Sequence, residues 1–297
     1  MEITLLDGSI GQELVHRAGA EATPLWSTSV MMEAPELVRA LHAEYFAAGA
    51  TIATANTYAL HENRLNRSGI GDELPDLVAQ ALRLARAARD AHGSGRVAGS
   101  LGPLLASYRP ELDPDLSEAE RQFGALVRRM EQDVDLYIIE TVSSLREAEG
   151  ALLGTAEARH PVWLALTVMD TDGTRLRSGE ALEDIAPLVR RFDPAAVLIN
   201  CSPPEVIGAG LDHIASLDRP FGAYANGFVA ITEEFLHDAP TVDVLEARTD
   251  LGPSRYAAQV MEWIGQGATI VGGCCEVGPG HIAETARRLR AAGHVIV

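Results

Sequence analysis

Short apolar runs alternate with longer amphipathic segments along all 297 residues of the chain. Eight of these runs have the length and the aliphatic or β-branched character of buried strands. They span residues 3–7, 51–56, 96–100, 136–140, 162–168, 196–201, 221–224 and 269–271. The segments between them carry apolar residues at i, i+3 and i+4, which predicts helices, most clearly over residues 35–48, 75–92, 117–132, 144–159 and 279–292.

This alternation of strands and helices predicts an α/β fold. Repeated strand–helix units are typical of a parallel sheet with helices packed outside it. Eight such units in a chain of this length favour a closed (β/α)8 TIM barrel over an open doubly wound sheet. No low-complexity segment or linker interrupts the pattern, so we expect a single domain over residues 1–297.

Two connections are unusually long for a compact barrel. Residues 102–115 follow the third predicted strand, and residues 227–253 follow the seventh. Long loops of this kind often act as lids or binding loops, although a surface insertion or a contact between subunits would explain them equally well. A homo-oligomer is therefore compatible with the sequence.

The composition excludes several classes of function. The formal net charge of −18 disfavours nucleic acid and anionic membrane surfaces as partners, while it tolerates a cationic ligand or simply aids solubility. All 24 Lys+Arg positions are arginine, and the absence of lysine excludes Schiff-base catalysis and a P-loop lysine. The chain starts with a strand-like run and has no stretch of about 20 apolar residues, so we expect a cytoplasmic protein without a membrane span.

The three cysteines all follow predicted strands. Cys201 ends the sixth run, and Cys274 and Cys275 come directly after the eighth. Because the carboxyl ends of barrel strands meet at one mouth, we expect the three thiols to cluster there. Three sulfur ligands with a fourth position open are typical of a catalytic Zn²⁺ site, whereas buried structural cysteines are the alternative. The preceding Gly272–Gly273 pair would supply a flexible backbone that turns both thiols inward.

An open zinc position suits a small-molecule thiol, because a metal-bound thiol loses its proton near neutral pH. Other polar residues lie at the same strand ends: Asp7 and Gly8 after the first strand, Glu140 at the end of the fourth, and Asn226 after the seventh. Carboxylates here could bind the α-ammonium group of an amino-acid substrate. The alternative is that Asp7 and Glu140 cap helices or bind loop amides.

Four aromatic residues lie in or near loops that follow strands: Trp26, Tyr58, Tyr108 and Tyr224. Such rings can bind a methylated cation through cation–π contacts, which would suit a cationic methyl donor. Ordinary packing is the alternative for each ring. We favour Trp26 and Tyr58 as the residues that contact a donor.

Several motifs together resemble the homocysteine S-methyltransferase family, which includes S-methylmethionine-dependent and betaine-dependent enzymes and the homocysteine module of cobalamin-dependent methionine synthase. The motifs are LLDGSIGQEL at the start, LWST at 25–28, ATANTY at 53–58, GSLGPLLASYRPE at 99–111, IIETVSSLREAEGA at 138–151, RSGE at 177–180, INCSPPE at 199–205 and GGCCEVGPGHI at 272–282. The NCS and GGCC pair is the most specific of them.

The resemblance implies roles for individual residues. Cys201, Cys274 and Cys275 would be the zinc ligands. Glu140 and the backbone around Asp7 and Gly8 would bind the amino-acid end of homocysteine. Asn226 would approach the metal when substrate is absent, and Trp26 and Tyr58 would face the methyl donor.

The seventh segment departs from the family pattern. The family usually reads close to YPNSGE here, whereas residues 224–228 read YANGF, without the proline or the acidic residue. The next loop, with Glu233, Glu234, His237 and Asp238, is also unlike the family pattern. The identity of the methyl donor is therefore open. Members of this length more often use S-methylmethionine or S-adenosylmethionine than betaine, and there is no room for folate and cobalamin modules.

These observations lead to one main hypothesis and three alternatives. The main hypothesis is zinc-dependent methyl transfer from a sulfonium donor to the thiolate of L-homocysteine, giving methionine. One alternative keeps this chemistry with a betaine or a dimethylsulfonium acid as donor. Another is a non-catalytic zinc-binding barrel with a closed four-ligand site. The last is a metal-free cysteine nucleophile, for which His281 is the nearest base in sequence.

Overall fold

A ring of parallel strands forms the centre of the computed structural model, which describes residues 1–19, 25–236 and 244–297. The strands of the ring in these residues are β1 Glu2–Leu5, β2 Ile52–Thr54, β3 Arg96–Leu101, β4 Leu136–Val142, β5 Val162–Leu166, β8 Ala196–Asn200, β9 Phe221–Tyr224 and β10 Ile270–Val271. Their spatial order is β1-β10-β9-β8-β5-β4-β3-β2. A parallel bridge between Leu6 and Ile52 closes the ring. The predicted TIM barrel is confirmed.

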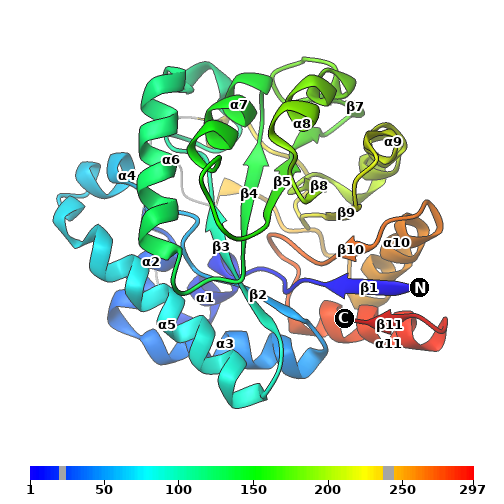
Figure 1. Ribbon diagram of the computed structural model, residues 1–297. Helices are drawn as coiled ribbons and strands as arrows, with labels where there is room; N and C mark the ends of the chain where they lie inside the picture. Colours follow the sequence, from blue (N-terminus) through cyan, green and yellow to red (C-terminus); the bar gives the residue numbers. More distant parts are fainter. Residues whose placement is uncertain (20–24, 237–243) are drawn as a thin grey trace.

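Helices surround this ring on the outside (Figure 1). In the described residues they are α1 Gly11–Ala18, α2 Ser27–Glu33, α3 Pro35–Ala48, α4 Glu62–Arg67, α5 Leu74–His92, α6 Leu116–Met130, α7 Leu145–Gly154, α8 Ala186–Phe192, α9 Pro204–Ile214, α10 Pro253–Gly265 and α11 Pro279–Ala291. Side-chain caps fix the first turns of α6 and α7. Asp115 accepts a hydrogen bond from the amide of Glu118, and Ser144 accepts one from the amide of Glu147. Short 3-10 turns complete the set: η1 Gly71–Glu73, η2 Pro110–Leu112, η3 Leu182–Ile185, η4 Ala215–Leu217 and η5 Glu234–Leu236.

Alternate positions of each strand fill two separate cores. The side chains inside the barrel are Leu6, Ile52, Ala98, Leu136, Ile138, Trp163, Ala165, Ala196, Leu198, Tyr224 and Ile270. The other strand positions face the helices and join the larger core. This alternation follows from the pleat of a strand, in which successive side chains point to opposite faces, and among these strands β4 departs from it near its end.

Three details differ from the pattern expected from the sequence. The run predicted over residues 162–168 stops at Leu166, and β6 Val168–Met169 pairs with β7 Asp172–Leu176 as an antiparallel hairpin. The helix predicted over residues 144–159 ends at Gly154. Near the C-terminus, β11 Val295–Ile296 pairs with β1, so the two ends of the chain lie side by side (Figure 1).

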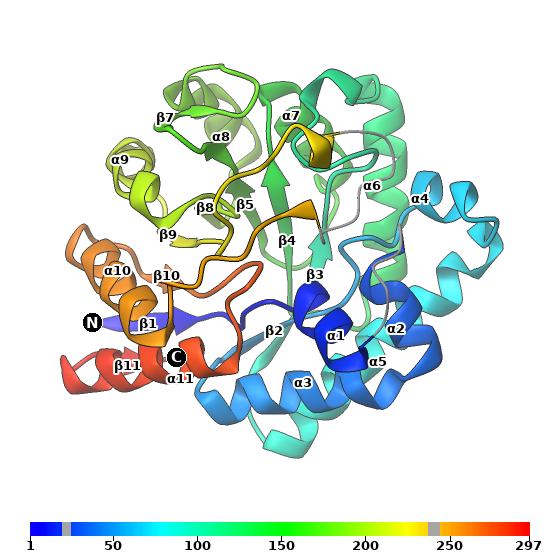
Figure 2. The same cartoon turned by 180° about the vertical axis from the view of Figure 1, so that it is seen from behind.

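Both long connections contribute to the mouth of the barrel, as expected of binding loops. Tyr108 from the first and Phe228, Phe235 and Leu245 from the second line the same cavity. Figure 2 shows the segment after β9, drawn in yellow, crossing in front of the strand ends. His237 and Asp238 lie outside the described residues.

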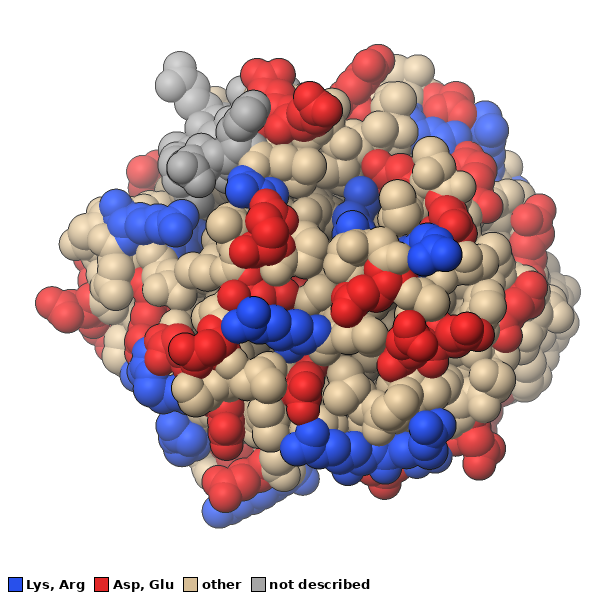
Figure 3. All heavy atoms as spheres, turned by 90° about the horizontal axis from the view of Figure 1, so that it is seen from above, with Lys and Arg blue, Asp and Glu red and all other residues tan. Residues whose placement is uncertain are grey.

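Acidic and basic side chains are interspersed on the face drawn in Figure 3. Many of the arginines pair with acidic residues one helical turn away, for example Arg121 with Glu118 and Arg287 with Glu284. Such exposed pairs contribute little to stability individually. No helix among the described residues is long and apolar enough to cross a membrane.

Gly222 on β9 is a sensitive position for the barrel. A Cβ atom built there would lie 1.6 Å from the carbonyl oxygen of Ile270 on the neighbouring strand, so one strand would have to move. We expect Gly222→Ala to lower the free energy of unfolding by about 3 kcal/mol, which urea titration would measure. Gly265→Ala is the matched control, because nothing lies within 4 Å of its Cβ and alanine favours the helix. Equal stability of the two variants would contradict this account of Gly222.

Candidate active site

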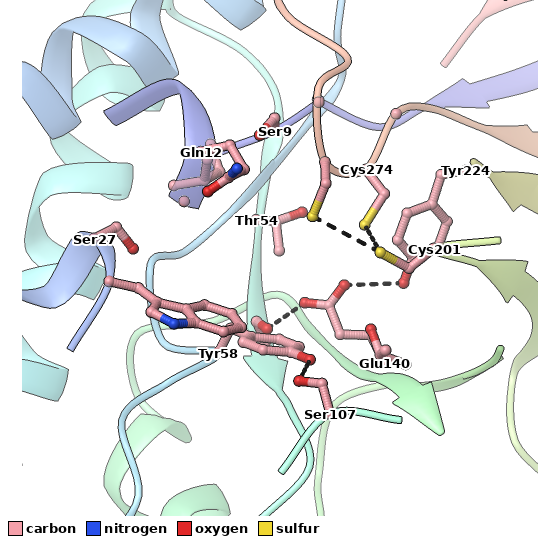
Figure 4. A pocket seen from close by; sticks show the side chains of 18 of the residues that line it. Ser9, Gln12, Ser27, Thr54, Tyr58, Ser107, Glu140, Cys201, Tyr224 and Cys274 are labelled. Carbon is pink, nitrogen blue, oxygen red and sulfur yellow. Dashed lines mark hydrogen bonds between the residues drawn. The ribbon is translucent and has the colours of Figure 1, made fainter. Parts of the chain in front are cut away.

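A cavity of about 950 Å³, including its open mouth, lies at the carboxyl ends of the barrel strands. Both long connections and the segments after β1, β2 and β10 form its walls. Figure 4 shows that polar side chains from different strands point into it. Of the residues predicted to act here, those that line the cavity are Asp7, Gly8, Trp26, Tyr58, Tyr108, Glu140, Cys201, Tyr224, Cys274 and Cys275.

The three cysteines form one cluster. The Sγ atom of Cys201 lies 2.9 Å from that of Cys274 and 3.8 Å from that of Cys275. All three sulfurs lie within 4.8 Å of one another, and they are the one group of potential metal ligands found in the described part of the chain. Hydrogen bonding from the other two thiols and from Tyr108 holds the pKa of Cys201 well below its usual range.

The neighbouring thiols titrate in the opposite direction. Their hydrogen bonds with the Cys201 sulfur raise the pKa of Cys274 and of Cys275, with burial adding to the effect. The cluster therefore concentrates its first negative charge on Cys201. A second or third negative charge in the same buried space is disfavoured, because like charges in a low dielectric repel strongly, and a cation at the sulfurs would offset this repulsion.

The glycine pair before the vicinal cysteines has a different role from the one expected. Neither Gly272 nor Gly273 has a positive φ, so the pair does not act through a left-handed turn. Instead, a Cβ on Gly272 would lie 2.4 Å from the Cβ of Leu6, and one on Gly273 would lie 2.2 Å from a methyl group of Val277. Gly272 thus allows the loop after β10 to pack tightly against the residues after β1, and Gly273 allows the same loop to fold back on itself at Val277.

Two buried carboxylates face the same cavity. Asp7 accepts hydrogen bonds from the backbone amide and the hydroxyl of Thr54, both at 2.7 Å. Glu140 accepts one hydrogen bond from the hydroxyl of Ser100 and another from Tyr224 at 3.1 Å (Figure 4). Asp7 thus binds a backbone amide, as one interpretation of the sequence expects, whereas both of these hydrogen bonds to Glu140 come from side chains.

Burial raises the pKa of both carboxyl groups to about 7. Hydrogen bonds oppose this effect at each group, while the negative charge of Glu140 adds to it at Asp7, and that of Cys201 adds to it at Glu140. Raised carboxyl pKa values in a cleft are typical of groups that bind a cation or a proton in function.

Aromatic rings form the wall opposite the cysteines. Trp26 and Tyr58 stack with ring centroids 6.0 Å apart and an interplanar angle of 12°. The hydroxyl groups of Tyr58 and Ser107 share a hydrogen bond of 2.6 Å (Figure 4). Phe235 lies 6.3 Å from Trp26 and 6.0 Å from Tyr108 between centroids. These rings offer apolar, electron-rich surface to a cationic ligand.

Two arginines already contact aromatic rings of the cavity. The guanidinium carbon of Arg64 lies 4.6 Å from the ring centroid of Trp26, and that of Arg177 lies 4.6 Å from the centroid of Tyr108. Tyr108 also donates a hydrogen bond of 3.0 Å to the Cys201 sulfur. Tyr108 is therefore fixed between the metal-ligand candidates and a cation.

Asn226 is buried, but it is not among the residues that line the cavity. Its side-chain oxygen accepts a hydrogen bond of 3.3 Å from the amide of Phe228, which stabilises the turn after β9. A role for Asn226 near a metal stays a prediction. His281 does not line the cavity either, and its ring atoms bond to the Gly278 amide and the Leu251 carbonyl group.

The backbone is strained around the cavity. The non-glycine residues with positive φ include Trp26 at 51°, Tyr108 at 64°, Thr141 at 63° and Cys201 at 48°, and all four line the cavity. Such conformations are costly for residues with a Cβ atom and persist only where surrounding contacts hold them. Their concentration here marks a functional site independently of the side-chain chemistry.

Sequence reasoning missed several residues that line the cavity. Thr54 and Ser100 lie at strand ends, so the rule that found Glu140 could also have found them. Ser107 and Phe235 lie within the long connections, where the sequence carries no signal for an inward direction. Thr141 was missed because a regular strand would turn it away from the cavity.

Comparison with known proteins agrees with this geometry. The family model for homocysteine S-methyltransferase matches residues 4–289. Homocysteine S-methyltransferase from Escherichia coli strain K12 is 30% identical, with 97% of this chain and 95% of that protein covered. Selenocysteine methyltransferase from Astragalus bisulcatus is 28% identical over 93% of this chain and 89% of its own length.

Solved structures of the Escherichia coli homocysteine methyltransferase MmuM share the fold. The metallated form has a TM-score of 0.81 and 28% identity, covering 97% of this chain and 96% of that chain. The apo form has a TM-score of 0.70 at similar coverage. The chain described here belongs to the homocysteine S-methyltransferase family.

Proposed function

We propose that this protein is a zinc-dependent methyltransferase that moves a methyl group from a sulfonium donor, S-methylmethionine or S-adenosylmethionine, to the thiolate of L-homocysteine, giving methionine. The observation that carries the proposal is the convergence of three thiols and two buried carboxylates on one cavity. The thiols suit a metal and a substrate sulfur, and the carboxylates suit the ammonium end of the same amino acid.

Cys201, Cys274 and Cys275 would hold the zinc ion. Three soft sulfur ligands fit zinc, and no fourth histidine, cysteine or carboxylate in the described ranges reaches all three sulfurs. Bound zinc would supply a lowered pKa for an acceptor thiol, so that its sulfur is available as a thiolate near neutral pH.

The residues of the chain would orient the acceptor and exclude water. Glu140 and Asp7 would hold the ammonium group, which fixes the acceptor sulfur beside the cysteine cluster. The acceptor sulfur then forms a bond to the donor methyl group while the bond from that methyl group to the sulfonium sulfur breaks. The electron pair of the broken bond stays on the leaving thioether. Because the acceptor has already lost its proton as a thiolate, the transfer step needs no general base. Proximity and alignment provide much of the rate enhancement.

Two alternatives lose support from the geometry. A closed four-ligand zinc site would need another ligand side chain, and the described residues supply three. A metal-free cysteine nucleophile would need a base, but both ring nitrogens of His281 bond elsewhere, at the start of α11 and to Leu251. A betaine or dimethylsulfonium acid as donor remains an alternative that experiment must separate.

Removal of one sulfur tests the metal site. Cys275→Ser should weaken zinc binding about a hundredfold or more, because each thiolate supplies a large share of the binding free energy of a structural or catalytic zinc. Methyl transfer should be lost together with zinc, measured by metal analysis and by methionine formation. Glu276→Gln in the same loop keeps all three thiols and should retain zinc. A Cys275→Ser protein without zinc that transfers methyl groups at the full rate would refute the proposal.

The pKa of Glu140 predicts how ligand binding depends on pH. An ammonium group requires the carboxylate form, and with a pKa near 7 the ionised fraction rises about tenfold between pH 6 and pH 8. L-Methionine, which has no thiol to titrate, should therefore bind at least tenfold more tightly at pH 8 than at pH 6, because Glu140 alone contributes about tenfold; calorimetry would measure this. Glu140→Gln should weaken methionine binding. The pH dependence that remains should be the smaller one caused by ionisation of Asp7.

Glu147→Gln is the matched control for that titration. Glu147 is also a buried carboxyl group whose pKa is raised, to about 8, but it bonds to Ser143 and lies outside the cavity. Its variant should keep the pH dependence of methionine binding. Methionine binding that is independent of pH in the unmodified protein would argue against ammonium recognition by Glu140.

The identity of the methyl donor is tested by comparing kcat/KM for a set of cationic methyl donors. Zinc-loaded protein and homocysteine should give the highest kcat/KM with S-methylmethionine or S-adenosylmethionine. Trp26→Leu should raise the donor KM about tenfold through loss of a cation–π contact, without a comparable change in the homocysteine KM. Greater turnover with betaine or a dimethylsulfonium acid would favour the catabolic alternative.

A further inference from the structure

Two consecutive residues of β4, Glu140 and Thr141, both line the cavity. In a regular strand they would point to opposite faces. Ile138 lies inside the barrel and Ile139 faces the helices, so the alternation would place Glu140 inside and Thr141 outside. Val142 should then lie inside, but it packs in the outer core.

A β-bulge explains this break in the alternation. The pairing of β4 with β5 shifts register between Ile139 and Val142, where Ile139 pairs with Leu164 and Val142 pairs with Leu166. Glu140 and Thr141 therefore face a single residue of β5. Bulges of this kind occur beside active sites, where they redirect a side chain.

Thr141 has a φ of 63°, in the left-handed region. A β-branched residue rarely adopts this conformation, so contacts from elsewhere must hold it. The amide oxygen of Asn200 accepts a hydrogen bond of 2.9 Å from the Thr141 backbone amide. The side-chain nitrogen of Asn200 donates a second, of 3.0 Å, to the Thr141 hydroxyl group.

Asn200 connects both halves of the candidate acceptor site. It is the last residue of β8, is fully buried and immediately precedes Cys201. Because β5 lies between β4 and β8, its side chain joins strands that do not pair with each other. Figure 4 shows Glu140 and Cys201 facing the same space from these two strands.

We propose that Asn200 is a positioning residue that holds the β4 bulge at Thr141 and thereby directs Glu140 toward the ammonium group of the acceptor. The inference rests on the proposed function for the identity of the ligand. Asn200 itself need not touch the acceptor. By fixing Glu140 relative to the strand that carries Cys201, it sets the distance between ammonium recognition and the thiol cluster.

The first test is Asn200→Ala in zinc-loaded protein. Loss of both hydrogen bonds should allow Thr141 to leave the left-handed region, and the homocysteine KM should rise about tenfold or more with a smaller change in kcat. Zinc content should stay the same. Thr141→Val, which removes only the hydroxyl contact, should raise KM about threefold and serves if Asn200→Ala does not fold.

The double variant Asn200→Ala/Thr141→Gly provides the decisive comparison. Glycine adopts a positive φ without a Cβ penalty, so it should restore the homocysteine KM to within about threefold of the original value. A structural role of Asn200 in simple packing would give no such rescue. Failure of the rescue in a folded, zinc-loaded double variant would overturn the proposal.

Tyr137→Phe is the matched control. It removes a buried hydrogen bond of 3.0 Å to Val127 from the same strand, but on the face that packs against the helices. It should lower the melting temperature without changing the homocysteine KM. If KM rose equally in this variant, loss of any buried hydrogen bond in β4 would be enough to weaken homocysteine binding. That result would contradict a specific role for Asn200.

Hydrogen exchange separates this proposal from the proposed function. In the ligand-free protein, the Thr141 amide should exchange at least about tenfold faster in Asn200→Ala than in the unmodified chain, because its acceptor is gone. Unchanged exchange would overturn the positioning role whatever the activity. If the unmodified protein fails to methylate homocysteine, the proposed function fails, and amide exchange still decides whether Asn200 holds the bulge.

Discussion

The seam between β1 and β2 is the constraint on which the site depends. Below the mouth, the amide of Thr51 donates a hydrogen bond of 2.7 Å to the carbonyl oxygen of Leu5. At the mouth, the carboxylate of Asp7 continues the seam by accepting two hydrogen bonds from Thr54. The Asp7 carboxylate, which helps to close the barrel, thus also lines the cavity. The hydrogen bonds that close the barrel therefore also fix Asp7 in the proposed acceptor site, since the carboxyl ends of parallel strands meet at one mouth only when the ring is closed.

Electrostatic repulsion is the second feature of this mouth. Three thiols and two carboxylates share one buried cavity. Burial is the main cause of the raised pKa values of Asp7 and Glu140, and repulsion from the negative charges of Glu140 and Cys201 adds a smaller part. A divalent metal at the thiols and an ammonium group at the carboxylates would each relieve part of that repulsion. Each cation would then favour ionisation of the groups facing the other, so binding of metal and acceptor should reinforce each other.

The sequence predicted those parts of the site that depend on strand ends alone. Cys201, Glu140 and Asp7 follow apolar runs, and the topology of a barrel then places them together. The bulge at Thr141 could not be predicted, because it depends on the pairing register with β5 and on a partner two strands away. The contact of Tyr108 with the Cys201 sulfur could not be predicted either, because it also joins residues far apart in the sequence. The hydrophobic pattern of the sequence identifies which residues lie at a strand end. The direction in which their side chains point is set by tertiary contacts.

The two halves of the cavity therefore rest on different parts of the fold. The acceptor half, with Glu140 and the cysteines, comes from strand ends and the tight turns directly after them. The opposite wall comes from loops: Trp26 lies before α2, Tyr58 follows β2, and Phe235 lies in the connection after β9. Loops tolerate substitution and insertion far better than barrel strands do. Under the proposed function, changes in these loops would alter the choice of methyl donor while the thiol acceptor stays the same, and the departure from the family pattern after β9 lies in such a loop.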